Sequence, residues 1–188
     1  IRRPPPRRGP RPVSRRRSAA TYLWRRLIAG LGAVVLLVTL GIFVLNVRGI
    51  EGAVIQMISH GISTGALFVC VGMLYERTHS RELADVLGIM NRMPLFCAFL
   101  TLFCLASLAF PGTNGFVGEF LILVGAFDYA GILLALAAPG AVLAAAYMLR
   151  MLQKILFGGT DNPDTSSLRD LNLREALTLL PLAFFVLW

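Results

Sequence analysis

The chain consists mainly of long apolar runs separated by short charged stretches. A membrane-crossing helix needs about 20 apolar residues, and runs of suitable length cover residues 27–47, 52–75, 94–127, 131–157 and 173–188. The pattern therefore predicts an all-α integral membrane fold with about five transmembrane helices. The last run is cut short at Trp188 and the first residue is Ile1, so we expect a fragment of a longer transmembrane domain.

The third run carries a turn signature in its middle. Pro111, Gly112 and Gly115 lie within the sequence "PGTNG", which separates two apolar halves, residues 94–110 and 116–127. Each half is too short to cross a membrane comfortably, whereas the two together are long enough. We therefore predict one transmembrane helix that is broken at residues 111–115.

Composition supports a membrane protein. Of the 188 residues, 56% are hydrophobic and 15% are charged, and the mean hydropathy is +0.72. Soluble domains are about a quarter charged. The net charge of +8 comes from residues 1–26, which hold ten arginines and no acid. The rest of the chain is nearly neutral, and we expect the lipid bilayer and no nucleic acid as its partner.

The Arg/Pro-rich segment, residues 1–26, is predicted to lie outside the transmembrane domain of residues 27–188. Its proline density excludes a regular helix. Three interpretations stay open: a basic tail that binds anionic lipid or nucleic acid, a targeting segment, and an artefact of GC-rich DNA read in the wrong frame.

The loop charges predict an orientation. Basic residues follow alternate spans and gather on one predicted side of the membrane: Arg25, Arg26, Arg77, Arg81, Arg92, Arg150, Lys154, Arg169 and Arg174. The opposite side has Arg48 together with Glu51 and Asp128. By the positive-inside rule, the first span runs from the cytoplasm or matrix outward.

Glu119 is the leading candidate for chemistry because it lies four residues beyond the predicted break, inside an apolar run. A charge at mid-membrane costs on the order of 2.5–3.5 kcal/mol, and such residues usually face a water path or the protein interior. Broken helices with nearby acids occur in ion transporters. We interpret Glu119 as a proton carrier; the alternative is an acid that only satisfies free N–H groups of the second half-helix.

His60 is the second candidate because it lies within the span 52–75. Histidine titrates near neutral pH and suits a proton relay. Possible polar lining residues surround it within one helical turn, namely Gln56, Ser59, Ser63 and Thr64. The alternative is a structural histidine that is hydrogen-bonded between helices.

Other chemistry has little support in the sequence. Cys70, Cys97 and Cys104 lie in apolar segments without a metal-binding spacing, so we predict no metal site and interpret them as small buried side chains. The sequence also contains no phosphate-binding or haem motif.

Several segments together resemble a known family. "IQMISHGISTGALF", "GMLYERTHSRELAD", "ASLAFPGTNGFVGEFLILVGAF" and "AYMLRMLQKILFG" are similar to the C-terminal part of chain M of the NADH–quinone oxidoreductase, respiratory complex I, called subunit four in mitochondria. The resemblance extends from about residue 41 to residue 188. It implies the last helices of a fourteen-helix antiporter-like subunit. Related chains L and N generally carry Lys where this chain has Glu119, so the acid favours M.

The resemblance also implies function. It makes the chain a proton-translocating membrane-arm subunit of NADH:quinone oxidoreductase, with a proton pathway through Glu119 and His60. NADH, FMN, iron–sulfur clusters and quinone would belong to other subunits, and chains of the L and N type would be neighbours. Alternatives are an Mrp-type cation/proton antiporter subunit and a non-transporting structural membrane fragment.

One region departs from the family pattern. The family begins its tenth helix with a sequence such as "KRLIAYSSVSHLGF", whereas this chain has "RRLIAGLGAVVLLVTLGIF". We therefore expect residues 1 to about 40 to come from a truncated or frame-shifted gene. The GC-rich codons of Arg and Pro favour a bacterial cell membrane over the mitochondrial inner membrane.

Overall fold

The structure is a computed structural model that describes residues 35–43, 45–79, 86–129, 131–159 and 168–188. The predicted segment 1–26 and the start of the predicted span 27–47 lie outside these residues. The described part contains helices and no strands, which confirms the all-α prediction for this part of the chain. Residues 35–43 are helical, and the labelled elements are α2 (Val47–Thr78), η2 (Ile89–Asn91), α3 (Pro94–Ser107), α4 (Asn114–Tyr129), α5 (Gly131–Phe157) and α6 (Leu173–Leu187).

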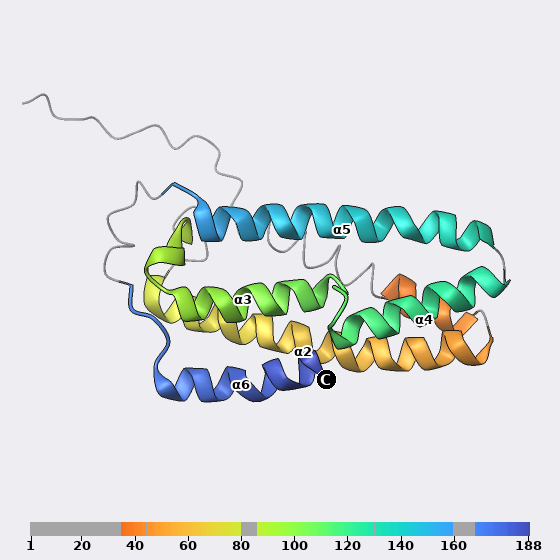
Figure 1. The fold of residues 1–188 in the computed structure, drawn as a ribbon, viewed down its shortest axis with the longest axis horizontal. Helices are drawn as coiled ribbons and strands as arrows, with labels where there is room; N and C mark the ends of the chain where they lie inside the picture. Colours follow the sequence, from red (N-terminus) through yellow and green to blue (C-terminus); the bar gives the residue numbers. More distant parts are fainter. Residues whose placement is uncertain (1–34, 44, 80–85, 130, 160–167) are drawn as a thin grey trace, which may run out of the picture.

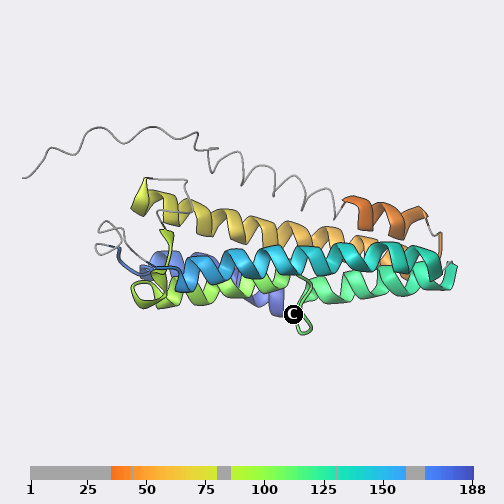
Figure 2. The same cartoon turned by 90° about the horizontal axis from the view of Figure 1, so that it is seen from above.

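The helices lie side by side along one long direction (Figures 1 and 2). Figure 1 shows the end of α2, the start of α3, the end of α5 and the start of α6 at one end of the bundle. This arrangement agrees with the loop charges, which place the same helix ends on one side of the membrane. By length and composition, the described helices include two stretches able to cross a membrane, Val47–Thr78 and Pro139–Phe157.

The start of α2 differs from the prediction. The apolar pattern continued the first span to residue 47 and began the second at residue 52, whereas α2 begins at Val47. Asn46 caps this helix, because its Oδ1 accepts a hydrogen bond of 2.7 Å from the Gly49 N–H. The prediction was wrong here because Arg48 and Glu51 interrupt the apolar run without interrupting the helix.

The break between α3 and α4 covers residues 108–113. Ala109 and Gly112 adopt left-handed backbone conformations there, with φ of 50° and 100°. Gly115 was predicted to lie in the break, but it lies in the first turn of α4. It packs so tightly that a Cβ atom would stand 2.9 Å from the Ala106 carbonyl oxygen, which explains why glycine is needed at a helical position.

The two halves of the broken helix are held in different ways. The residues of α3 belong to one apolar core that also includes residues of α2, α5 and α6, with Phe96 and Phe103 among its largest fully buried side chains. In α4, by contrast, glycine residues contact the first half of α2. Pro139 and Pro181 lie inside α5 and α6, and both helices continue through them.

Candidate functional site at the helix break

Glu119 lies in the second turn of α4, which begins at Asn114 directly after the break. Its side chain is half-buried. Among the residues that the structure describes, Glu119 has no hydrogen bond or ion pair. It also lies beyond the first turn of α4, where free backbone N–H groups would satisfy an acid, so a capping role does not explain its position.

Two close glycine contacts define how α2 and α4 pack. A Cβ atom on Gly118 would stand 2.7 Å from Gln56 Oε1, and one on Gly125 would stand 2.8 Å from the Gly49 nitrogen. Since the residue numbers rise along α4 while they fall along α2, the two helices are antiparallel. The contact at Gly118 places Gln56 directly against the residue that precedes Glu119.

The same antiparallel packing brings a polar face of α2, which Gln56, Ser59 and Ser63 form, toward the break. Ser59 and Ser63 lie about one and two turns beyond Gln56, and they are 3% and 2% exposed. Gln56 is 6% exposed, so these three predicted lining residues share a buried face. In an antiparallel pair, this face continues past Gly118 toward the start of α4.

His60 and Thr64 lie at the margin of that face and are half-buried. Thr64 Oγ1 is 3.2 Å from His60 Nε2 and 3.4 Å from Nδ1, so it holds the imidazole ring within its own helix. No hydrogen bond joins His60 to Glu119 in the described part of the chain. The structure thus shows no direct contact between the two residues.

Three buried oxygen atoms near the break have no hydrogen-bond partner among the described residues. They are Gln56 Oε1, Ser107 Oγ at the end of α3, and Asn114 Oδ1 at the start of α4. Buried polar atoms normally have a partner, in protein or in ordered water. One of these unpartnered acceptors therefore lies on α2 and two lie at the ends of the broken helix.

Comparison with known proteins identifies the type of chain. The family model described as NADH:quinone oxidoreductase/Mrp antiporter, transmembrane, matches residues 28–144. The chain belongs to this antiporter family. It is therefore an integral membrane protein, and its break and half-buried acid lie within a transmembrane domain of that family.

Relatives of this antiporter-family chain come from organelles and bacteria. It is 44% identical over 151 residues to NADH-ubiquinone oxidoreductase chain 4 of Marchantia polymorpha, and 41% identical over 150 residues to NADH-quinone oxidoreductase subunit M of Rhodobacter capsulatus. These matches cover 80% of this chain but only 30% and 29% of the relatives. The chain thus spans less than a third of their length.

Solved structures agree with this assignment. Respiratory complex I from Thermus thermophilus contains a chain that superposes with a TM-score of 0.74 at 32% identity, covering 80% of this chain and 32% of that one. An archaeal membrane-bound sulfane sulfur reductase complex gives a TM-score of 0.69 at 22% identity, which shows a shared fold only.

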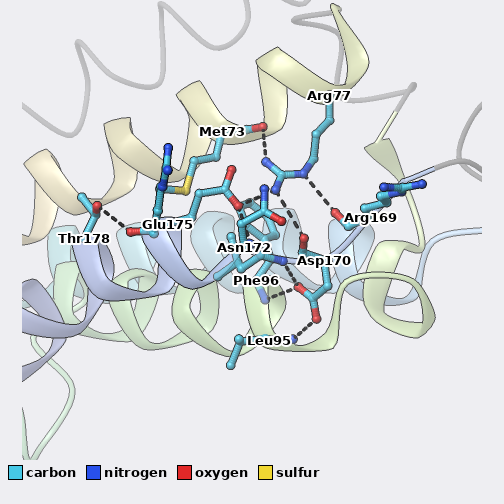
Figure 3. Close-up of polar contacts among 11 residues, drawn as sticks. Met73, Arg77, Leu95, Phe96, Arg169, Asp170, Asn172, Glu175 and Thr178 are labelled. Carbon is cyan, nitrogen blue, oxygen red and sulfur yellow. Dashed lines mark hydrogen bonds and ion pairs between the residues drawn. The ribbon is translucent and has the colours of Figure 1, made fainter.

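The antiporter-family chain also has a polar cluster at one end of its bundle (Figure 3), which the sequence did not reveal. Arg77, at the end of α2, donates a hydrogen bond of 2.6 Å to Glu175 Oε2 in α6 and one of 3.0 Å to the Arg169 carbonyl oxygen. The Asp170 carboxylate accepts from the N–H groups of Leu95 and Phe96. From the sequence, Arg77 was interpreted only as a loop charge; the spacing of Asn172 and Glu175 was the available signal, since it matches a capping box.

The described residues contain no group of three or more His, Cys, Asp or Glu side chains that could hold a metal ion. Cys70, Cys97 and Cys104 are free thiols and are buried in the apolar core of this antiporter-family chain.

Proposed function

We propose that this chain is part of a proton-translocating membrane-arm subunit of an NADH:quinone oxidoreductase, and that Glu119 and His60 carry its proton pathway. The relatives named above are subunits of such enzymes. The observation that carries the proposal is the position of Glu119: a half-buried acid in the second turn after a helix break, next in sequence to Gly118, which contacts Gln56 of α2.

The residues around the break suggest how protons would move. A carboxyl group inside a membrane domain is stable when it is protonated or hydrated. The partnerless oxygens of Gln56, Ser107 and Asn114 would accept hydrogen bonds from water, which would carry protons to and from Glu119. Ser59 and Ser63 would extend this polar route along α2 toward His60, whose two ring nitrogens could pass a proton along it.

In this role, the chain would be one part of a larger membrane assembly. The α3 and α4 helices would form one crossing of the membrane, and together with the segment at 35–43, α2, α5 and α6 they would give five crossings. Chains of the L and N type would be neighbours, and NADH, FMN, iron–sulfur clusters and quinone would be bound by other subunits. A bacterial cell membrane is our preferred location, although the relatives include both bacterial and organellar proteins.

Replacement of Glu119 by Gln in the intact complex tests the function. The amide keeps the size of the side chain but cannot release a proton, so we expect fewer protons pumped per electron while NADH oxidation continues through the redox subunits. Glu76→Gln, an exposed acid in the last turns of α2, is the matched control and should pump normally. Normal pumping by Glu119→Gln would contradict the proposal.

The Mrp-type antiporter is the second candidate because the matching family model includes both kinds of protein. The two functions differ in their driving force. Proton movement that follows a sodium gradient in vesicles, without NADH oxidation, would favour the antiporter. A purely structural role for Glu119 predicts a different result, namely lower assembly of Glu119→Gln with normal pumping by the complexes that assemble.

A further inference from the structure

The segment before α6 is bonded to the start of the first half-helix. Asp170 Oδ2 accepts a hydrogen bond of 2.9 Å from the Leu95 N–H, and Oδ1 accepts one of 3.0 Å from the Phe96 N–H. Leu95 and Phe96 lie in the first turn of α3, which otherwise leaves its backbone donors without partners. Asp170 is thus an N-terminal cap supplied by a segment 75 residues away along the chain.

Phe185 of α6 is bonded to the start of the second half-helix. Asn114 Nδ2 donates a hydrogen bond of 2.8 Å to the Phe185 carbonyl oxygen. Asn114 is the first residue of α4, and Phe185 lies in the last turn of α6. Figures 1 and 2 both show the end of α6 close to the link between α3 and α4.

Arg77 joins the segment before α6, and the first turn of α6, to α2. Its guanidinium group donates to the carbonyl oxygens of Arg169 and Asp170 and to Glu175 (Figure 3). The Arg77 and Glu175 side chains are only 14% and 18% exposed, so this contact is largely shielded from water. Between its two ends, α6 packs Leu179, Ala183 and Val186 into the apolar core.

We propose that residues 168–187 are a brace that sets the position of the two half-helices relative to each other, with Asp170 and Asn114 as positioning residues for Glu119. The break at 108–113 lacks continuous helical hydrogen bonds, contains the left-handed residues Ala109 and Gly112, and is held by short-range bonds such as that from the Thr113 N–H to the Phe110 carbonyl oxygen. The brace adds bonds from outside the break to the N-terminus of each half. The positioning role rests on the proposed function of Glu119.

The test uses the intact complex with Asp170→Ala and Asn114→Asp. The Asn114 change keeps the shape of the side chain and removes its donor. Asp170→Asn keeps one of the two acceptor oxygens for α3, so it should show a smaller effect than Asp170→Ala. Thr178→Ala is the control, because this exposed α6 hydroxyl bonds only to the Arg174 carbonyl oxygen of its own helix among the described residues.

Two readouts are expected to change. Amide hydrogen exchange in the first turn of α3 should be about fivefold faster in Asp170→Ala, as the loss of a helix cap implies. In Asn114→Asp, exchange should be faster in the two segments that the Asn114–Phe185 bond joins, the start of α4 and the last turn of α6. The number of protons pumped per electron by each assembled complex should also fall, which a role in assembly alone would not produce. Unchanged exchange in both variants would overturn the brace itself.

Glu119→Gln measured in parallel separates the two proposals. If it lowers the proton-to-electron ratio while the Asp170 and Asn114 variants leave that ratio unchanged, the proposed function stands and the positioning role is overturned. If Glu119→Gln leaves the ratio unchanged, the proposed function is overturned and the positioning role with it. The Asp170 and Asn114 variants are also compared with Thr178→Ala. Faster amide exchange together with fewer protons pumped per electron in these variants supports the brace and its positioning role.

Discussion

Gly118 lies directly against Gln56: a Cβ atom on Gly118 would be 2.7 Å from Gln56 Oε1 and 2.8 Å from the Gln56 nitrogen. One of these neighbours is backbone, which cannot rotate away as a side chain can. The absence of a side chain at Gly118 therefore determines how closely α4 approaches α2, and it determines the position of the adjacent Glu119.

We predict that Gly118→Ala destabilises the subunit and impairs pumping. The added methyl group must push α4 away from α2, and overpacking of this kind costs about 1–3 kcal/mol. The midpoint of thermal unfolding of the purified complex should fall, together with the protons pumped per electron.

Gly72→Ala is the matched control for this prediction. Gly72 lies in α2, where a Cβ atom would meet nothing within 4 Å in the described part of the chain. The change should be neutral or stabilising by about 1 kcal/mol, because alanine is the better helix former. Equal changes in thermal midpoint for Gly118→Ala and Gly72→Ala would show that the contact of Gly118 with Gln56 does not affect stability.

Much of the helical arrangement could be predicted from the sequence because it depends on local pattern. The apolar run 131–157 has the bounds of α5, and Pro111 with Gly112 marked the region where the chain leaves the helix. The sequence also grouped Gln56, Ser59 and Ser63 around His60 as possible polar lining residues. These features follow from periodicity and backbone preference alone.

The missed features depend on contacts between distant parts of the chain. Asp170 caps a helix that starts 75 residues earlier, and no local signal indicates which N-terminus a loop acid will reach. The contact of Gly118 with Gln56 also requires the register of two helices. The capping role of Asn46 was missed for another reason. Asn46 lies in an uncharged, largely apolar run, and this run predicted that the first span continues to residue 47.

We predict that Asn46→Ala destabilises the junction of α2 and α4. Asn46 Oδ1 accepts from the Gly49 N–H, and Nδ2 donates a hydrogen bond of 2.9 Å to the Gly125 carbonyl oxygen. Loss of the cap and of this bond should cost about 1–3 kcal/mol. Asn46→Asp keeps the acceptor and loses the donor, so its thermal midpoint should lie between those of the wild type and Asn46→Ala. If the thermal midpoint of Asn46→Asp were no higher than that of Asn46→Ala, the Oδ1 cap would contribute nothing to stability.

The three cysteines should resist modification in the folded complex. Cys70, Cys97 and Cys104 are 0%, 1% and 0% exposed, so we expect no labelling by a membrane-permeant maleimide before denaturation. A Tyr129→Cys variant supplies a positive control, because Tyr129 is 70% exposed at the end of α4. Mass spectrometry of the labelled peptides distinguishes the sites, and rapid labelling of any native thiol would mean that the core opens.

The two ion pairs that join α2 to other helices in the described part of the chain should differ strongly in their contribution to stability. Arg77 and Glu175 are 14% and 18% exposed, whereas Arg48 and Asp128 are 61% and 46% exposed. Arg77→Ala leaves Glu175 without its partner in a mostly buried site and should cost about 3 kcal/mol. Arg48→Ala should cost about 1 kcal/mol or less, because water screens an exposed pair.

Arg77→Lys examines the geometry of this site separately from its charge. Lysine keeps the positive charge but lacks the planar fork that reaches Glu175 and the backbone oxygens of Arg169 and Asp170 together. We therefore expect the thermal midpoint of Arg77→Lys to lie closer to that of Arg77→Ala than to the wild type. Full retention of stability by lysine would mean that charge alone accounts for the cluster, and the hydrogen bonds to the segment before α6 would then be incidental.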